Sequence, residues 1–421
     1  MRAVTRALEP GPPIDARRVA GDDGVYFQNE RVTLAGTGRA AVLPLPRGLT
    51  QPAGWHHAEE WLAGAPRDDT VGLPGTGPVA FGALAFERGT PGELVVPSIL
   101  YGRAADGTEW VTVVGDDGPE ATRELLLESA SPPRIEPTAT VEVLESRPDY
   151  PSAVLKATKA IALGALRKVV LARRLVLGTA GTVVASNMLD RLHSIEPSST
   201  AFLIGGRDGA FLGASPELLM SRRGRSVLSN PLAGTAPLGP DGGDQLLGSA
   251  KNLEEHEIVV ADIAGVLDPR CSELVVPSHP ALVELHTMAH LGTRIEGQLL
   301  EEDGRVPSAL DLVAALHPTP AVGGVPRDPA LGLIAKLEPG RRGRWAGPVG
   351  WLDADGDGDW MVGLRSAWLS GATAIVWAGA GIVAASDPES ELAETEVKLV
   401  PVLEGLAPGS SALLGANQLR Y

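Results

Sequence analysis

The chain has 421 residues, 44% of them hydrophobic and 21% charged, and its 52 acidic against 36 basic residues give a formal net charge of −16. These values are typical of a folded globular protein with room for one large or two ordinary domains. The excess of acid argues against binding to nucleic acid or to anionic membranes, because both attract basic surfaces.

Cysteine usage and apolar segments bear on the compartment. The single cysteine, Cys271, cannot form an internal disulfide and suits a reducing environment. The first ten residues contain no apolar core of signal-peptide length, and the longest nearly apolar run, 374–385, is interrupted by glycines. That run is also too short to span a bilayer. We therefore expect a cytoplasmic protein without a membrane segment.

Lysine is rare, because only six of the 36 basic residues are lysines. A chain that uses arginine for most cations keeps lysine where the amine must lose its proton or act as a compact charge. Lys168, Lys251 and Lys398 are candidates for such roles.

The first 140 residues contain short apolar runs between glycines and prolines, which predict strands over 39–46, 93–102 and 107–115. The Pro-rich segment 131–140 predicts a connector. Apolar residues at helical spacing then predict a helix within 149–166, and the β-branched run 168–178 predicts a strand. Strand and helix patterns alternate from there to the C-terminus.

A helix is predicted over 249–268, where Val259, Asp262 and Val266 follow Glu255 at i+4, i+7 and i+11. Glu255 therefore continues a core-facing stripe. A buried carboxylate needs a cation or a set of hydrogen-bond donors. Glu255 either forms a buried ion pair or binds a ligand.

The segment "SDPESELAETEVK" (386–398) predicts a second helix, with a cap and a proline in its first turn. Glu391, Glu394 and Lys398 fall within one narrow arc. The simplest interpretation is a solvated face with an i,i+4 ion pair. Two helices that each present a carboxylate would instead make an oxygen-rich site suited to Mg²⁺.

Other motifs are weaker. The run "DADGDGD" (353–359) resembles a calcium loop, but its twelfth position is Leu364 where a glutamate is needed, so a hairpin turn is predicted. The segment "HTMAH" (286–290) has histidines at zinc-like spacing but lacks the inner glutamate and a third ligand. No complete phosphate-loop pattern and no G-x-S-x-G elbow occur in the sequence.

Nine segments in order resemble the chorismate-utilising enzymes, a family that includes anthranilate, aminodeoxychorismate, isochorismate and salicylate synthases. They are "KVVLARR" (168–174), "FLGASPELL" (211–219), "NPLAGTAPLG" (230–239), "SAKNLEEHEIVV" (249–260), "HLGTRIEGQL" (290–299), "LHPTPAVGGVP" (316–326), "WAGPVGWLD" (345–353), "GLRSAWL" (363–369) and "WAGAGIVAASDPESELAETEVK" (377–398). The resemblance implies an α+β fold of packed sheets flanked by helices with a central cleft. It makes 141–421 the chorismate-binding catalytic region and 1–140 a strand-rich part of the same fold.

The resemblance also implies a site. One Mg²⁺ would be held by Glu255 and Glu394, with Glu391 as an outer partner that acts through water. The residues that would line the chorismate pocket or receive its carboxylates are Gly234, Thr235, His290, Ala321, Trp345, Arg365, Gly379, Gly381 and Lys398.

Lys168 and Glu217 bear on the reaction. Members of the family that use ammonia carry glutamine at the position of Lys168, whereas those that add water carry lysine. The chemistry agrees, because water attacking C2 needs a general base, and desolvation favours a neutral lysine amine. Glu217 matches the general acid of the family. The C4 hydroxyl leaves only if it is protonated, and an apolar setting lets a carboxyl keep its proton.

Ala233 stands where aminodeoxychorismate synthases that form a covalent adduct carry lysine. No Cys-His-Glu glutaminase portion is found, so no glutamine amidotransferase subunit is expected.

Isochorismate synthase and salicylate synthase both add water and remain as alternatives. "LHPTPAVGG" has the isochorismate synthase form, and salicylate synthases tend to carry tyrosine at the place of Trp345. We therefore predict a Mg²⁺-dependent isochorismate synthase, an isomerase whose product would feed a catecholate siderophore, menaquinone or a salicylate-derived compound. Salicylate synthase is the alternative, followed by a non-catalytic chorismate-binding subunit, which would need no acid–base pair.

Overall fold

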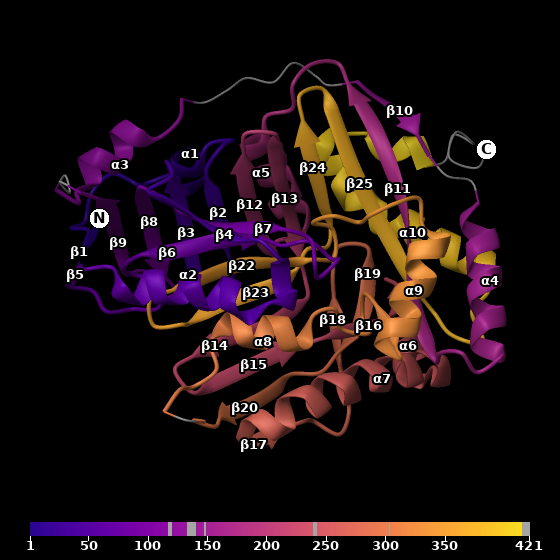
Figure 1. Cartoon of the computed structure of the whole chain (residues 1–421). Helices are drawn as coiled ribbons and strands as arrows, with labels where there is room; N and C mark the ends of the chain where they lie inside the picture. Colours follow the sequence, from indigo (N-terminus) through magenta and orange to yellow (C-terminus); the bar gives the residue numbers. More distant parts are fainter. Residues whose placement is uncertain (117–119, 133–139, 147–148, 239–241, 303, 415–421) are drawn as a thin grey trace.

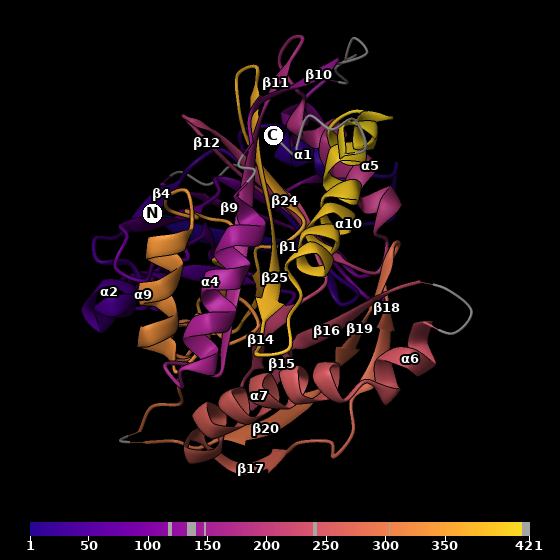
Figure 2. The same ribbon diagram turned by 90° about the vertical axis from the view of Figure 1, so that its right-hand side faces the viewer.

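A computed structural model describes residues 1–116, 120–132, 140–146, 149–238, 242–302 and 304–414. It contains two large β-sheets, a small third sheet and helices that cover them (Figures 1 and 2). The predicted α+β class is confirmed. Most of the predicted connector, 133–139, lies outside the described residues. Among the described residues, no helix combines the length and apolar character needed to cross a membrane.

The largest sheet has thirteen strands, and one of them, β21 (Gly324–Val325), pairs only with β11. The others follow in spatial order: β10 (Val141–Glu145), β11 (Lys168–Thr179), β25 (Thr373–Ile382), β24 (Ser366–Ser370), β13 (Gly209–Ser215), β12 (Thr200–Gly206), β2 (Val25–Gln28), β3 (Val32–Thr37), β8 (Ile99–Ala104), β9 (Glu109–Gly115), β1 (Arg2–Ala7) and β5 (Arg67–Asp69).

The second sheet has nine strands and the third has three. The second runs β17 (Cys271–Val275), β20 (Ile295–Leu299), β15 (Ser226–Asn230), β14 (Leu218–Arg223), β23 (Gly358–Val362), β22 (Pro348–Asp353), β6 (Val79–Ala83), β7 (Gly92–Val96) and β4 (Ala41–Leu45). The third runs β16 (Leu232–Pro237), β19 (Met288–Gly292) and β18 (Ala281–Glu284).

The two large sheets pack face to face through buried aromatic side chains. Phe27, Trp110 and Phe202 come from the first sheet, and Phe81 and Trp351 come from the second. Rings of this size dominate the area buried in a core. Both sheets contain strands from before and after residue 140, so the N-terminal strands help to build the frame of the catalytic region.

Helices cover the outer faces of the sheets (Figures 1 and 2). They are α1 (Ala16–Ala20), α2 (Pro52–Gly64), α3 (Arg123–Ser129), α4 (Tyr150–Ala162), α5 (Ala185–Ile195), α6 (Gly242–Gly248), α7 (Ala250–Leu267), α8 (Ala309–Leu316), α9 (Arg327–Leu337) and α10 (Pro388–Leu406), with short 3₁₀ turns at Gly48–Thr50, Asp268–Arg270 and Ser410–Leu414. Helices α5 and α10 pack on the first sheet. Helices α2, α7 and α8 pack on the second sheet.

The predicted elements around the site are confirmed. The patterns at 149–166, 168–178 and 249–268 form α4, β11 and α7, and 386–398 lies largely in α10. The Asp387 side chain caps α10 by accepting from the amide of Ser390, with Pro388 in the first turn. The run 353–359 joins β22 to β23 as a hairpin. The apolar run 93–102 forms two strands, because Pro97 has no N–H to continue a ladder.

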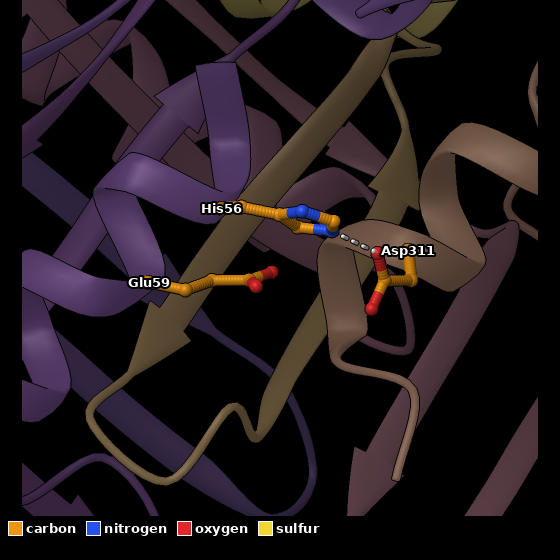
Figure 3. Close-up of side chains that lie close together, drawn as sticks. All are labelled: His56, Glu59 and Asp311. Atoms are coloured by element: carbon orange, nitrogen blue, oxygen red, sulfur yellow. Dashed lines mark hydrogen bonds and ion pairs between the residues drawn. The ribbon is translucent and has the colours of Figure 1, made fainter. Parts of the chain in front are cut away.

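His56, Glu59 and Asp311 come together where α2 meets the start of α8 (Figure 3). Their oxygens already accept hydrogen bonds from protein donors. Arg305 bridges Glu59 and Asp311 at 2.7 Å each, and His56 lies 3.0 Å from Asp311. Asp311 also forms a capping box with Ser308. These contacts link α2 to the start of α8 and satisfy the carboxylates with donors from the protein. The cluster therefore has a structural role.

Candidate active site

A pocket of about 730 Å³ lies between the first sheet with α10 and the third sheet with α7. A concave pocket lined by apolar side chains and a few polar groups suits a small-molecule ligand. Its lining includes Glu217, Gly234, Thr235, Glu255, His290, Ala321, Trp345, Arg365, Gly379, Gly381, Glu394 and Lys398. All of these were singled out from the sequence, and segments from both halves of the catalytic region bring them together.

Two glutamates that line the pocket each lie against a lysine. Lys168 Nζ lies 3.0 Å from Glu255 Oε1, without the alignment of a hydrogen bond. Lys398 donates to Glu394 at 2.6 Å and also to the carbonyl of Gly379 at 3.0 Å.

Lys168 and Glu391 were also predicted, and both lie just behind the lining. Lys168 is fully buried and reaches the pocket through Glu255. Glu391 accepts from Lys251 at 2.9 Å and is 2% exposed. Three of the six lysines therefore surround this one site, as the scarcity of lysine suggested.

Gly381 leaves room for the carboxylate of Glu255. A Cβ atom at this position would lie 2.1 Å from Glu255 Oε1 and 3.2 Å from Lys168 Cε. Only glycine lets helix α7 bring its carboxylate so close to strand β25. The contact between Glu255 and Lys168 therefore requires glycine at position 381.

We expect Gly381→Ala to displace the Glu255 carboxylate and lower turnover, with the fold retained because a side chain rather than backbone must yield. Activity and thermal unfolding should be measured together, with Gly332→Ala at an exposed position of α9, where an added Cβ meets nothing within 4 Å, as the control for a glycine substitution. Turnover equal to that of the unaltered protein would show that the position of Glu255 does not matter.

The edge of β25 presents amide groups to the pocket. Pairing with β24 ends at Val376, whereas pairing with β11 continues to Ile382. The carbonyl of Gly379 accepts from Lys398, so this residue turns its N–H and C=O away from β11. In an antiparallel ladder both groups of a residue point the same way and alternate along the strand. Gly379 and Gly381 therefore direct their N–H groups toward the open edge.

Arg365 and His290 contribute charge and polarity. Arg365 has φ +47°, a left-handed conformation that costs a non-glycine residue about 1–3 kcal/mol. Its Nη1 donates to the carbonyl of Lys398 at 2.8 Å. Burial lowers the pKa of Arg365 from a value so high that the guanidinium stays charged. Burial, aided by the charges of Lys398 and Arg365, lowers the pKa of His290 well below its usual value, so its ring is neutral.

Glu217 lies in the turn between β13 and β14 and is 3% exposed. Its backbone amide donates a hydrogen bond to Ser215 Oγ at 3.3 Å. Burial raises the pKa of its carboxyl to about 8, against the opposing charges of Lys168 and Lys398. Glu217 is therefore a protonated acid at neutral pH.

The sequence did not reveal the support behind the pocket. Arg342 and Glu338 form a buried ion pair, with Arg342 Nε donating at 2.8 Å. Arg342 also donates to the carbonyls of Val322 and Val170, at 2.6 and 2.8 Å. Both valines line the pocket, so this guanidinium fixes two of its walls. No spacing in the sequence links Arg342 to these carbonyls.

Trp377 was also missed. Its ring stacks on Trp345 with centroids 5.8 Å apart and an interplanar angle of 18°. Both indoles line the pocket.

The fold and this acid–base pocket define an enzyme for a small anionic ligand, and comparisons with known proteins identify the family. Residues 12–407 match the model of the family described as chorismate binding enzymes. The chain is 36% identical to the isochorismate synthase MenF of Bacillus subtilis, over 78% of this chain and 75% of that protein. It is also 36% identical to the isochorismate synthase EntC of Escherichia coli, over 77% and 80%.

A solved structure agrees. The menaquinone-specific isochorismate synthase MenF from Escherichia coli superposes with a TM-score of 0.78 at 26% identity, covering 96% of this chain and 94% of that one. The chain belongs to the chorismate-binding enzyme family.

Proposed function

We propose that this protein is an isochorismate synthase that converts chorismate to isochorismate. The observation that carries the proposal is the combination of Glu217, a buried acid with a raised pKa that lines the pocket, with a buried lysine, Lys168, that lies against Glu255 in the wall of the same pocket. A protein that only binds chorismate needs no such acid–base pair. The relatives named as isochorismate synthases support the same reaction.

We propose that Mg²⁺ binds between Glu255 and Glu394. The two carboxylates come from separate helices and line one pocket, and the space at Gly381 admits the first of them. Hard carboxylate oxygens with room for substrate oxygens suit this ion. When bound, Mg²⁺ would hold the ring carboxylate of chorismate and offset its charge.

The pocket residues would orient the substrate. Arg365, Lys398 and the amides of Gly379 and Gly381 offer donors for carboxylates along one side of the pocket. Guanidinium and backbone donors recognise carboxylates well. Gly234, Thr235 and His290 border the same space, with His290 Nδ1 donating to the carbonyl of Gly234 at 3.2 Å.

The reaction balances without any other reagent. Lys168 takes a proton from water as its oxygen forms a bond to C2, and the ring double bonds shift toward C4. Glu217 donates its proton to the C4 hydroxyl, which leaves as water. One water enters and one departs, so chorismate is isomerised. Acid and base groups positioned in this way each contribute about 10²–10⁴ in rate.

Water rather than ammonia is the nucleophile in this proposal, so the enzyme would need no glutamine amidotransferase subunit. We also propose that it works in the cytoplasm, where its single cysteine suits a reducing environment. Ala321, Val322 and Trp345 wall the pocket. None of these side chains carries a hydroxyl to orient the enolpyruvyl ether for elimination of pyruvate. We therefore place isochorismate, rather than salicylate, as the product.

Incubation with chorismate and Mg²⁺, followed by chromatography, tests the proposal. Isochorismate should form in equilibrium with chorismate. Unchanged chorismate under these conditions, or anthranilate formed on addition of ammonium, would contradict it.

The rate should fall as pH rises past about 8, because Glu217 must hold its proton to act as the acid and its pKa is raised to about 8. Below that pH the carboxyl of Glu217 is protonated, so its titration no longer changes the rate. We expect Glu217→Gln to be slower by about 10²–10⁴ and to lose this decline, since an amide does not titrate. A pH profile of kcat/KM for both proteins is the measurement. A wild-type rate that stays level through pH 8 would remove Glu217 from the acid role.

A further inference from the structure

A second pocket of about 740 Å³ adjoins the first. Its floor is one face of the large sheet across four neighbouring strands, where Arg174 of β11 is paired with Trp377 of β25, and Trp368 of β24 is paired with Phe211 of β13. The segment 341–345, just before β22, forms its wall. We call it the tryptophan–arginine pocket.

Its charge is opposite to that of the whole protein. Four arginines line it, Arg174, Arg341, Arg342 and Arg344, and none of the described lining residues is acidic, although the chain has a net charge of −16. Arg342 forms an ion pair with Glu338, and Arg174 forms one with Glu145 at 2.6 Å.

Arg341 and Arg344, which belong to the wall, are the arginines that a ligand can use. Arg344 Nη1 is buried and lacks a hydrogen-bond partner within the described part of the chain. A buried donor without a partner is costly and calls for an acceptor. Guanidinium groups favour carboxylates, which they bind through two parallel hydrogen bonds.

Aromatic rings supply the remaining surface. Trp345, Trp368 and Trp377 line the pocket, and the guanidinium of Arg344 lies 4.7 Å from the ring centre of Trp368. Indole faces stack with planar rings at centroid distances of about 4.5–7 Å. Aromatic side chains beside the unpartnered Nη1 donor of Arg344 match a ligand that is both aromatic and anionic.

The two pockets share a wall. Trp345 and Trp377 line both of them. On β25, Ile375 and Trp377 face the tryptophan–arginine pocket, whereas Trp377, Gly379 and Gly381 border the substrate pocket. These positions are two residues apart along the strand, so their side chains lie on the same face of the sheet. A ligand that moves either indole therefore changes the shape of the substrate pocket.

We propose that the tryptophan–arginine pocket binds a planar aromatic carboxylate and that its occupancy changes the affinity of the neighbouring pocket for chorismate. Coupling of this kind is reciprocal, so the substrate must alter binding of the effector by the same factor. The binding step stands independently of the proposed function, whereas the effect on chorismate rests on it.

Salicylate serves as the probe, and its binding to the full-length protein can be followed by titration calorimetry. Arg341→Gln and Arg344→Gln should each weaken binding by about tenfold, the usual loss for a charged hydrogen bond. Arg225→Gln, at a 51% exposed side chain in another part of the fold, should leave binding unchanged. Cyclohexanecarboxylate, which has the charge without the flat ring, should bind more weakly than salicylate.

A second arm excludes the substrate pocket as the binding site. Salicylate should still bind Arg365→Gln, and it should change the KM for chorismate in the wild-type protein but not in Arg344→Gln. Binding that is lost in Arg365→Gln and retained in Arg344→Gln would place salicylate in the substrate pocket and overturn the proposal. The absence of saturable binding to the wild-type protein would overturn it as well, whatever reaction the enzyme catalyses.

Discussion

Replacing Lys168 by glutamine should lower the rate of isochorismate formation by a factor on the order of 10²–10⁴ while chorismate still binds, because the general base is lost and the walls of the pocket remain. Lys168 lies behind Glu255 and does not itself line the pocket. Single-turnover rates and chorismate binding, measured on the same protein, separate the two effects.

Two further variants distinguish a base from a charge. Lys168→Arg keeps a cation beside Glu255 but cannot give up its proton, so it should be as inactive as Lys168→Gln. Lys336→Gln removes an exposed lysine of α9 and should have no effect. If Lys168→Arg retained activity within a few-fold of wild type, Lys168 would act only through its charge.

Glu255→Gln and Glu394→Gln should each weaken Mg²⁺ binding and make turnover depend on higher concentrations of the ion. Substitution of the outer partners of a bound metal typically costs about 10–100-fold in affinity, so loss of a direct carboxylate should cost at least as much. Calorimetric titration with Mg²⁺ reports this without any reliance on activity.

Glu389→Gln is the matched control, because this glutamate lies on α10 beside the site but is exposed. It removes the same charge and should leave Mg²⁺ binding unchanged. Equal losses in all three variants would mean that the carboxylates act only through bulk charge and that neither Glu255 nor Glu394 holds the ion.

Much of this site follows from local sequence features. Helix α7 was predicted from a stripe of side chains at helical spacing, and helix α10 from its cap and the proline in its first turn. The rarity of lysine directed attention to Lys168, Lys251 and Lys398, each of which lies against a glutamate at the site. The resemblance to a family then linked the two helices to one pocket, which no local pattern does.

The missed features depend on contacts between distant segments. Arg342 supports the pocket by binding the carbonyls of Val170 and Val322, and backbone carbonyls leave no trace in a sequence. In the sequence, Trp377 cannot be told from any other aromatic residue of a strand, because its stacking on Trp345 is a contact between distant segments. The interleaving of strands from both sides of residue 140 in each large sheet likewise results from long-range pairing.

We expect the reaction to stop at isochorismate, and one coupled assay tests this most directly. The enzyme is incubated near neutral pH with chorismate and Mg²⁺, without any added lyase, in the presence of lactate dehydrogenase and NADH. Isochorismate should accumulate and equilibrate with chorismate while NADH is consumed at most slowly. Stoichiometric oxidation of NADH at the rate of chorismate loss would contradict the account and identify a salicylate synthase.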